Sequence, residues 1–316
     1  MTHNISTAPW AGAVTKGSSR RPQAIAHRGY KAAFPENTMA AFKGAVEVGA
    51  SALEADLHLS KDGVVVLSHD ATLSRCFGQK LKIADCNWDQ LSTYRTLREP
   101  RQPMPRLTDL LEYLREPGQE EIWLFLDIKT DDEANNLLPA LAEAIASTPT
   151  KGRLWNQRIM LGPWNAEWVG ACLRYLPGFP IALIAFSPDY ATAALPVPNL
   201  NFNLFNYSFS TRRGARFIRE AKECDRLIFS WSDNHDEWMA LSIRNEVDGV
   251  ITDDPKRFLE LCASDVVREK SIRFTFKQTA LWVFINFLVL ATEIVLFFVK
   301  GPSRKLVKDA LGGLNH

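Results

Sequence analysis

The sequence predicts a parallel (β/α)8 barrel, a TIM barrel, followed by one membrane-anchoring helix. Short apolar runs typical of strands alternate eight times with amphipathic helical segments, which is the pattern of this barrel. No linker rich in proline, glycine or serine interrupts the series, and a single barrel commonly reaches about 250 residues. An open, doubly wound sheet is the alternative arrangement of the same elements.

The expected elements follow the spacing of apolar residues. We expect strands at residues 23–26, 52–57, 122–128, 158–161, 181–186, 200–204, 227–231 and 249–252. Helices are expected at residues 38–48, 107–114, 134–146, 166–175, 190–194, 212–222, 237–245 and 256–261. A run at 64–68 pairs back on the second strand as a hairpin, and 71–105 is irregular. The expected divisions are a disordered arm at 1–22, the barrel at 23–265, an anchor helix at 280–299 and a basic tail at 300–316.

Composition excludes some classes of partner. Lys and Arg number 37 and Asp and Glu number 36, so the chain has no basic field and we expect no nucleic-acid partner. The five scattered cysteines lack metal-like spacing and are typical of free thiols in a reducing compartment. The first 23 residues have no apolar core and are not a secretory signal, although another targeting role stays open.

A long apolar stretch lies near the C-terminus. Residues 281–299 include only Asn286, Thr292 and Glu293 as strongly polar residues, and as a helix they would span roughly 28 Å of a bilayer core of about 30 Å. We expect a single anchor that leaves the barrel in the cytosol, at the mitochondrial outer membrane, the endoplasmic reticulum or a lipid droplet. A helix lying in one leaflet and a core helix of the barrel are the alternatives.

Two pairs of charged residues end predicted strands. Glu54 and Asp56 are two residues apart, so both side chains leave the same face of a strand, and Asp127 and Lys129 repeat the spacing. Converging carboxylates repel each other unless a cation lies between them, and oxygen ligands favour Mg²⁺ or Ca²⁺. Because barrels gather their chemistry at one set of strand ends, we expect the three carboxylates to form a metal site. If only one such pair were present, a solvated strand edge or a structural ion pair would be an equal alternative to a metal site.

Two histidines follow strand-like runs at equivalent positions, namely His27 and His69. A lone histidine is usually structural, but two that flank a phosphorus atom can act in turn as base and acid. Arg28 is a good bidentate ligand for phosphate, and Lys129 offers a cation for an anionic substrate. We expect His58 to lie past the rim without a role.

An ordered set of short motifs carries a family resemblance. The motifs are His27-Arg28-Gly29, Pro35-Glu36-Asn37-Thr38, Glu54-Ala55-Asp56, Lys61-Asp62-Gly63, His69-Asp70, Arg75, Asp127-Ile128-Lys129 and Asp248-Gly249-Val250-Ile251-Thr252-Asp253-Asp254-Pro255. They resemble the glycerophosphodiester phosphodiesterase family over roughly residues 24–261. The resemblance implies a (β/α)8 barrel that cleaves phosphodiesters with a divalent metal. It implies that the three carboxylates hold the metal, that the two histidines are the acid/base pair, and that Arg28 and Lys129 bind the phosphate.

One position departs from the family pattern. The third ligand is more usually Glu, and Asp127 is shorter by one methylene, about 1.5 Å. A shifted strand or a bridging water would absorb the difference, and the related sphingomyelinase D group resembles this arrangement with Asp. Trp231, at the end of the seventh strand, resembles the substrate-platform tryptophan of the family, with core packing an equal alternative. We expect Trp164 to pack in the core or to line the rim.

The barrel with its anchor resembles the phosphatidylglycerol phospholipase C branch of the family. This resemblance implies cleavage of phosphatidylglycerol to diacylglycerol and glycerol phosphate, begun by an intramolecular attack of the headgroup hydroxyl. One alternative is hydrolysis of soluble glycerophosphodiesters or lysophospholipids, with the anchor serving only for location. Another is a catalytically inactive, membrane-tethered lipid-binding adaptor. The sequence leaves open which histidine is the acid, which metal binds, the acyl preference and the oligomeric state.

Overall fold

The computed structural model describes residues 4–16, 19–264 and 274–311. Within them, parallel strands form a ring in the order β7-β6-β4-β3-β11-β10-β9-β8. The ring closes through a parallel bridge from Leu161 to Ile181, where the Leu161 N–H donates to the Pro180 carbonyl at 2.9 Å. The strands are β3 (Gln23–Ala26), β4 (Ala52–Leu59), β6 (Trp123–Ile128), β7 (Ile159–Pro163), β8 (Ala182–Ala185), β9 (Asn201–Phe205), β10 (Ile228–Trp231) and β11 (Gly249–Thr252). The barrel prediction is confirmed, and the open sheet is excluded because the two end strands meet.

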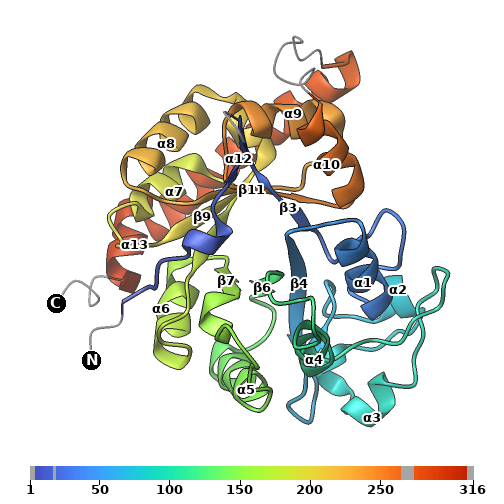
Figure 1. Ribbon diagram of the computed structural model, residues 1–316. Coiled ribbons are helices and arrows are strands. Elements are labelled where there is room, and N and C mark those ends of the chain that lie inside the picture. Colours follow the sequence, from blue (N-terminus) through green and yellow to red (C-terminus); the bar gives the residue numbers. More distant parts are fainter. Residues whose placement is uncertain (1–3, 17–18, 265–273, 312–316) are drawn as a thin grey trace.

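Helices follow the strands and surround the ring (Figure 1). They are α1 (Met39–Glu47), α4 (Leu107–Leu114), α5 (Ala134–Ala146), α6 (Ala166–Tyr175), α7 (Pro188–Ala194), α8 (Arg212–Glu223), α9 (Asp236–Arg244) and α10 (Pro255–Ala263). Their apolar sides share one core with the strands, which includes Phe202 and Phe258. The side chains of Thr38, Asn165 and Thr211 accept hydrogen bonds from first-turn N–H groups and fix where α1, α6 and α8 begin.

An insertion between β4 and α4 forms part of the rim. Its elements are β5 (Val65–Leu67), α2 (Ser74–Phe77), η2 (Ile83–Asp85) and α3 (Trp88–Leu91). β5 pairs antiparallel with β4, as the hairpin prediction required. The stretch expected to be irregular has short helical turns and a small core of its own that contains Leu73, Ile83 and Leu91. This core supports the loop that carries His69.

The N-terminal arm is ordered where the structure describes it, which corrects the expectation of a disordered arm. Its elements are η1 (Pro9–Ala11), β1 (Val14–Lys16) and β2 (Ser19–Arg21). The Trp10 ring packs edge-on against Trp123 with 5.3 Å between centroids, and the Gln23 amide donates to the Trp10 carbonyl at 2.8 Å. Because Trp123 and Gln23 begin their strands, the arm covers the N-terminal end of the barrel. This contact could not be predicted from the sequence because Trp10 is isolated among small and polar residues.

Two further helices follow the barrel, α12 (Phe276–Lys300) and α13 (Ser303–Leu311). Residues Phe276–Val295 are long and apolar enough to cross a membrane, and none of that window is buried. The alternative of a core helix of the barrel is therefore wrong. α13 packs against α6 and α7 and buries Val307 and Leu311, so part of the expected basic tail is a docked helix. Residues 312–316 of that tail lie outside the described residues.

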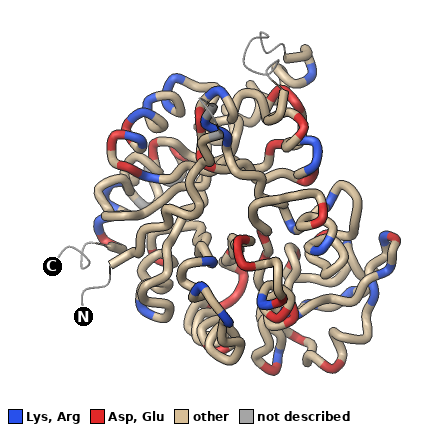
Figure 2. Tube along the Cα trace, in the orientation of Figure 1, with Lys and Arg blue, Asp and Glu red and all other residues tan. Residues whose placement is uncertain are grey.

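Charged residues of both signs are interspersed along the outer helices (Figure 2). On α8, for example, Arg216 lies 3.7 Å from Glu220 one turn away. This mixture differs from the one-signed basic stripe that is typical of nucleic-acid-binding domains.

Candidate active site

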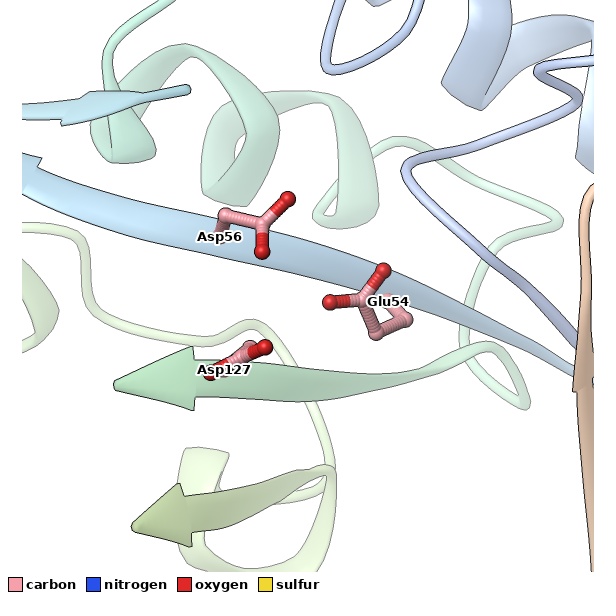
Figure 3. A group of neighbouring side chains, drawn as sticks. All are labelled: Glu54, Asp56 and Asp127. Carbon is pink, nitrogen blue, oxygen red and sulfur yellow. The ribbon is translucent and has the colours of Figure 1, made fainter. Parts of the chain in front are cut away.

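Three carboxylates meet on two neighbouring strands. Glu54 and Asp56 lie on β4, and Asp127 lies on β6 directly opposite Asp56 in the parallel register. Oxygens of the three residues lie within 4.8 Å of one another, and all three side chains are buried. Figure 3 shows them converging on one space between the strands. The structure thus brings together the trio that the two-residue spacing predicted.

Burial makes three bare anions unfavourable in this space. Burial, together with the charges of Asp56 and Asp127, raises the pKa of Glu54 well above its ordinary value. Burial also raises the pKa of Asp127 to about 6. For Asp56, burial acts in the same direction, but the charges of Lys129 and Arg28 outweigh it and its pKa is lowered. The cluster therefore holds a proton at neutral pH or requires more positive charge than these two side chains provide.

Arg28 and Lys129 supply that positive charge in part. Lys129 Nζ lies 2.7 Å from Asp56 Oδ1 and 2.6 Å from Asp127 Oδ2. Arg28 Nε lies 3.2 Å from Asp56 Oδ2. Three buried carboxylates that converge within 4.8 Å fit a hard divalent cation such as Mg²⁺ or Ca²⁺.

His27 follows β3 and is oriented by the carboxylate of Asp253, which follows the last strand of the barrel, β11. Its Nδ1 lies 2.6 Å from Asp253 Oδ1. The two residues meet because β3 and β11 are adjacent and pair Ala26 with Thr252. Burial lowers the pKa of His27, and the hydrogen bond with Asp253 opposes this effect. With Nδ1 engaged, Nε2 is the ring nitrogen available for proton transfer.

His69 follows β5 and is oriented in the same way by Asp70. Its Nδ1 lies 2.8 Å from Asp70 Oδ1. Arg75 contacts both Asp70 and Glu36 at 2.7 Å, and Glu36 in turn pairs with Arg28 at 3.0 Å. Burial lowers the pKa of His69, although the charge of Asp56 and the hydrogen bond with Asp70 oppose this. A chain of ion pairs therefore connects His69 to Arg28, whose guanidinium lies beside the carboxylates.

The loop after β3 turns sharply to place Arg28. Arg28 and Gly29 have φ values of 56° and 79°, both in the left-handed region. In this turn the Arg28 N–H donates to Glu54 Oε2 at 2.7 Å. A Cβ on Gly29 would lie 2.6 Å from the carbonyl carbon of Ala41, so only glycine fits against α1 here. Backbone strain of this kind is often found at functional loops.

The comparisons with known proteins agree with this geometry. Residues 27–257 match the glycerophosphoryl diester phosphodiesterase family. The chain belongs to this family. It is similar to the glycerophosphodiester phosphodiesterase of Caldanaerobacter subterraneus, with 26% identity over 246 residues that cover 75% of this chain and 96% of that protein. It is also similar to the crystal structure of the Thermotoga maritima glycerophosphodiester phosphodiesterase, with a TM-score of 0.63 and 25% identity over 76% of this chain and 98% of that one.

A shorter similarity joins the chain to a lipid enzyme. It is 46% identical over 70 residues to the lysophospholipase D of Rattus norvegicus, and the match covers 22% of each protein. Membership of the glycerophosphoryl diester phosphodiesterase family makes this protein a phosphoric diester hydrolase built on a TIM barrel. The hypothesis of an inactive adaptor is therefore not favoured. The individual roles of the site residues stay predictions.

Three side chains without an assigned role contact the site. Trp164 Nε1 donates to Asp127 Oδ1 at 2.6 Å, and Asn37 Nδ2 donates to Asp56 Oδ2 at 2.8 Å. His58, which we expected past the rim, is buried, with its Nε2 3.3 Å from the His69 carbonyl oxygen and its Nδ1 2.8 Å from Asp132 Oδ2.

Each of these three residues had a signal in the sequence. His58 continues the alternation of Glu54 and Asp56 along one strand, and that parity pointed to the same face. Asn37 lies inside a motif of the family, and Trp164 follows a strand end. The expectation that Trp164 packs or lines the rim therefore missed its hydrogen bond to a carboxylate of the cluster.

Trp231 ends β10 within an aromatic cluster at the rim. Its ring centroid lies 5.3 Å from that of Trp164, 5.0 Å from Phe186 and 5.1 Å from Phe205. Lys129 Nζ lies 5.4 Å from the centroid of the Trp164 ring, so the aromatic cluster borders the carboxylate site. Trp231 is therefore placed beside the site, and its role as a substrate platform stays a prediction.

Proposed function

We propose that the protein cleaves phosphatidylglycerol at a membrane surface to diacylglycerol and glycerol phosphate. The observation that carries this proposal is the pairing of each histidine with its own carboxylate, His27 with Asp253 and His69 with Asp70, around the buried carboxylate trio. One histidine accepts a proton from the headgroup hydroxyl, and the other donates a proton to the leaving oxygen.

The reaction suits a glycerol headgroup. The hydroxyl next to the phosphorylated carbon forms a bond to phosphorus while the bond from phosphorus to the diacylglycerol oxygen breaks. This intramolecular attack saves the entropy of bringing in a nucleophile. The cyclic phosphate that results is opened by water to glycerol phosphate. Choline and ethanolamine headgroups have no adjacent hydroxyl and cannot react in this way.

Glu54, Asp56 and Asp127 would hold the divalent cation. When bound, Mg²⁺ or Ca²⁺ supplies positive charge next to the phosphoryl oxygens, where negative charge grows during cleavage. Lys129 and Arg28 pair with the carboxylates, and a cation that neutralises those carboxylates would leave both side chains to bind the phosphate. Trp164 would keep Asp127 oriented through its hydrogen bond.

A lipid substrate is supported by the apolar helix that follows the barrel. In the proposal, α12 anchors the enzyme with its barrel in the cytosol, at the mitochondrial outer membrane, the endoplasmic reticulum or a lipid droplet. The unburied window Phe276–Val295 supports membrane contact.

The similarity to a lysophospholipase D favours a second candidate function. In that reaction the bond between the phosphate and the headgroup breaks, and a lysophospholipid yields lysophosphatidic acid. The same histidines would serve, with water as the nucleophile. The two candidate reactions break different bonds of the phosphodiester. The first breaks the bond from phosphorus to the diacylglycerol oxygen, and the second breaks the bond between the phosphate and the headgroup.

One assay separates them. Purified protein is incubated with phosphatidylglycerol, lysophospholipids, phosphatidylcholine and glycerophosphodiesters, and the products are identified by mass. Release of diacylglycerol from phosphatidylglycerol, and from no other lipid, supports the main proposal. Release of phosphatidic or lysophosphatidic acid refutes cleavage between phosphorus and the diacylglycerol oxygen. Comparing the full chain with a chain ending at residue 264 on vesicles and on soluble substrates tests the role of the helices.

A further inference from the structure

A large apolar cavity lies between the barrel rim and the C-terminal helices. Its volume is about 760 Å³, within the range of roughly 300–1,000 Å³ that small-molecule sites occupy. The barrel contributes Ile184, Phe186 and Phe205 from the ends of β8 and β9. The opposite wall is formed by α12 and α13, through residues such as Val289 and Leu306.

Trp164 joins this cavity to the carboxylate site. Its indole N–H donates to Asp127 Oδ1 at 2.6 Å, and the same residue lines the cavity. Its ring centroid lies 5.6 Å from that of Phe186, so the aromatic cluster at the rim separates the two spaces. A molecule with a phosphate at the carboxylates therefore has an apolar space beside it, one indole away.

Polar contacts hold α12 on the catalytic end of the barrel. Glu293 pairs with Arg213 at 2.8 Å and accepts a hydrogen bond from the Ser187 hydroxyl. About three turns before Glu293, Trp282 Nε1 donates to Ser210 Oγ at 2.5 Å. Ser187 follows β8, and Ser210 ends the turn η4 (Asn206–Ser210) that follows β9. The helix thus lies along the loops that border the site, and its one acidic residue is paired with the barrel.

The other side of α12 is apolar and exposed. Phe284, Phe287 and Phe298 are exposed to 58%, 65% and 81%. Exposed apolar surface of this extent is typical of a membrane or protein contact. Because the cavity side and the exposed side belong to one helix, lipid that contacts the outer side lies next to the mouth of the cavity.

We propose that this cavity binds an acyl chain of the lipid substrate while the phosphate lies at the carboxylates. The inference rests on the proposed function, since it assigns a place to the apolar part of that substrate. α12 then has two roles, as one wall of the chain site and as the surface that rests on the lipid. The aromatic cluster of Trp164, Phe186, Phe205 and Trp231 separates the phosphate from the chain.

The first test measures kcat/KM in mixed micelles for phosphatidylglycerols of increasing chain length. Burial of each additional methylene raises kcat/KM by up to roughly fourfold, until the cavity is filled. The substitution Val289→Trp fills the cavity from α12, and Leu306→Trp fills it from α13. Both variants are expected to flatten the dependence on chain length.

Val295→Trp is the matched control, because it makes the same exchange on the same helix at a residue that is 59% exposed. It should keep the chain-length dependence of the wild type. Thermal melting of each variant checks folding, and two cavity variants on different helices guard against misfolding of one. If both cavity variants kept the wild-type dependence of kcat/KM on chain length, the assignment would be overturned. It would also be overturned if Val295→Trp lost this dependence as much as the cavity variants do.

A binding test separates this inference from the proposed function. In a His27→Ala background without turnover, phosphatidylglycerol with a brominated acyl chain should quench tryptophan fluorescence, and Trp164→Phe should remove most of that quenching. Absence of quenching overturns the cavity assignment. Quenching in a protein whose wild type releases no diacylglycerol overturns the proposed function and leaves the cavity assignment standing.

Discussion

Each candidate site residue is oriented by a second side chain, which is adjacent in sequence for His69 and distant in sequence for His27 and Asp127. Asp253 holds His27, Asp70 holds His69, and Trp164 holds Asp127. An imidazole fixed through Nδ1 presents Nε2 in a defined direction, which proton transfer requires. We therefore expect activity to depend on these orienting residues as well as on the residues that contact the substrate.

Replacing Asp253 with Asn tests this orientation. Burial lowers the pKa of His27 and the hydrogen bond to Asp253 raises it, so the variant should have a still lower His27 pKa. The limb of the pH–rate profile that reports His27 should move to lower pH, and kcat should fall between about 10- and 100-fold, part of the roughly 10²–10⁴ that acid–base catalysis contributes. A shift of the acidic limb identifies His27 as the base, and a shift of the alkaline limb identifies it as the acid. An unchanged profile contradicts the role of His27.

The positions of these residues were predictable in part. The spacing of Glu54 and Asp56, and the repeat of that spacing at Asp127, predicted the cluster of three carboxylates because a strand alternates its faces. The contact between Trp164 and Asp127 spans 37 residues. Local spacing cannot report a contact of that separation. His58 was misjudged although its strand parity was known, because burial depends on the insertion that covers it.

At the scale of elements, the site depends on how closely the loop after β3 approaches α1. Gly29 sits at φ 79°, and a Cβ there would lie 2.6 Å from the backbone of Ala41. The turn aims the Arg28 N–H at Glu54. The conformation of Gly29 thus sets the position of the Arg28 guanidinium and of the Glu54 carboxylate.

The substitution Gly29→Ala should lower the free energy of unfolding by more than the backbone strain alone, which is about 1–2 kcal/mol. Gly63→Ala is the matched control, because Gly63 has φ 84° and nothing lies within 4 Å of its Cβ position. Urea unfolding of both variants measures the difference between their free energies of unfolding, and this difference isolates the contact with α1. Equal losses of unfolding free energy in the two variants would contradict the close approach of Gly29 to α1.

The loop after β10 contains a buried acid with a measurable effect on stability. Burial raises the pKa of Asp233 to about 7, and the Ser230 hydroxyl donates to it at 3.2 Å. The unfolded value is about 3.9. Because the folded state holds the proton more tightly, the stabilisation is complete below about pH 4 and is lost as the pH rises through 7.

Asp233→Asn should therefore be more stable than the wild type at pH 8, by up to about 4 kcal/mol. The advantage should vanish near pH 4, where both side chains are neutral. Urea unfolding at a series of pH values checks this, and a stability difference that is independent of pH would contradict it.

At the scale of the whole molecule, the two ends of the barrel are closed differently. The N-terminal end is covered by the arm through Trp10 and Trp123. The C-terminal end carries the site and is bordered by α12, which contacts the loops after β8 and β9. The end of the barrel that carries the site is therefore the end next to the apolar helix α12.

The sequence predicted the barrel better than these additions to it. Alternating strands and helices were placed correctly because their periodicity is local. The arm and the docking of α13 were not expected, since Trp10 packs on a residue more than a hundred positions away and Leu311 is buried against α6 and α7. Such contacts bury isolated apolar residues and produce no repeating pattern.

The central claim is that a divalent cation held by Glu54, Asp56 and Asp127 is needed for cleavage. The most direct test strips the purified enzyme with a chelator and titrates Mg²⁺ or Ca²⁺ back while diacylglycerol release from phosphatidylglycerol is followed. We predict that activity is lost on chelation, returns with one of these ions, and does not return in Asp56→Asn. Full activity in the stripped enzyme, or metal-dependent recovery in Asp56→Asn equal to the wild type, would contradict the account.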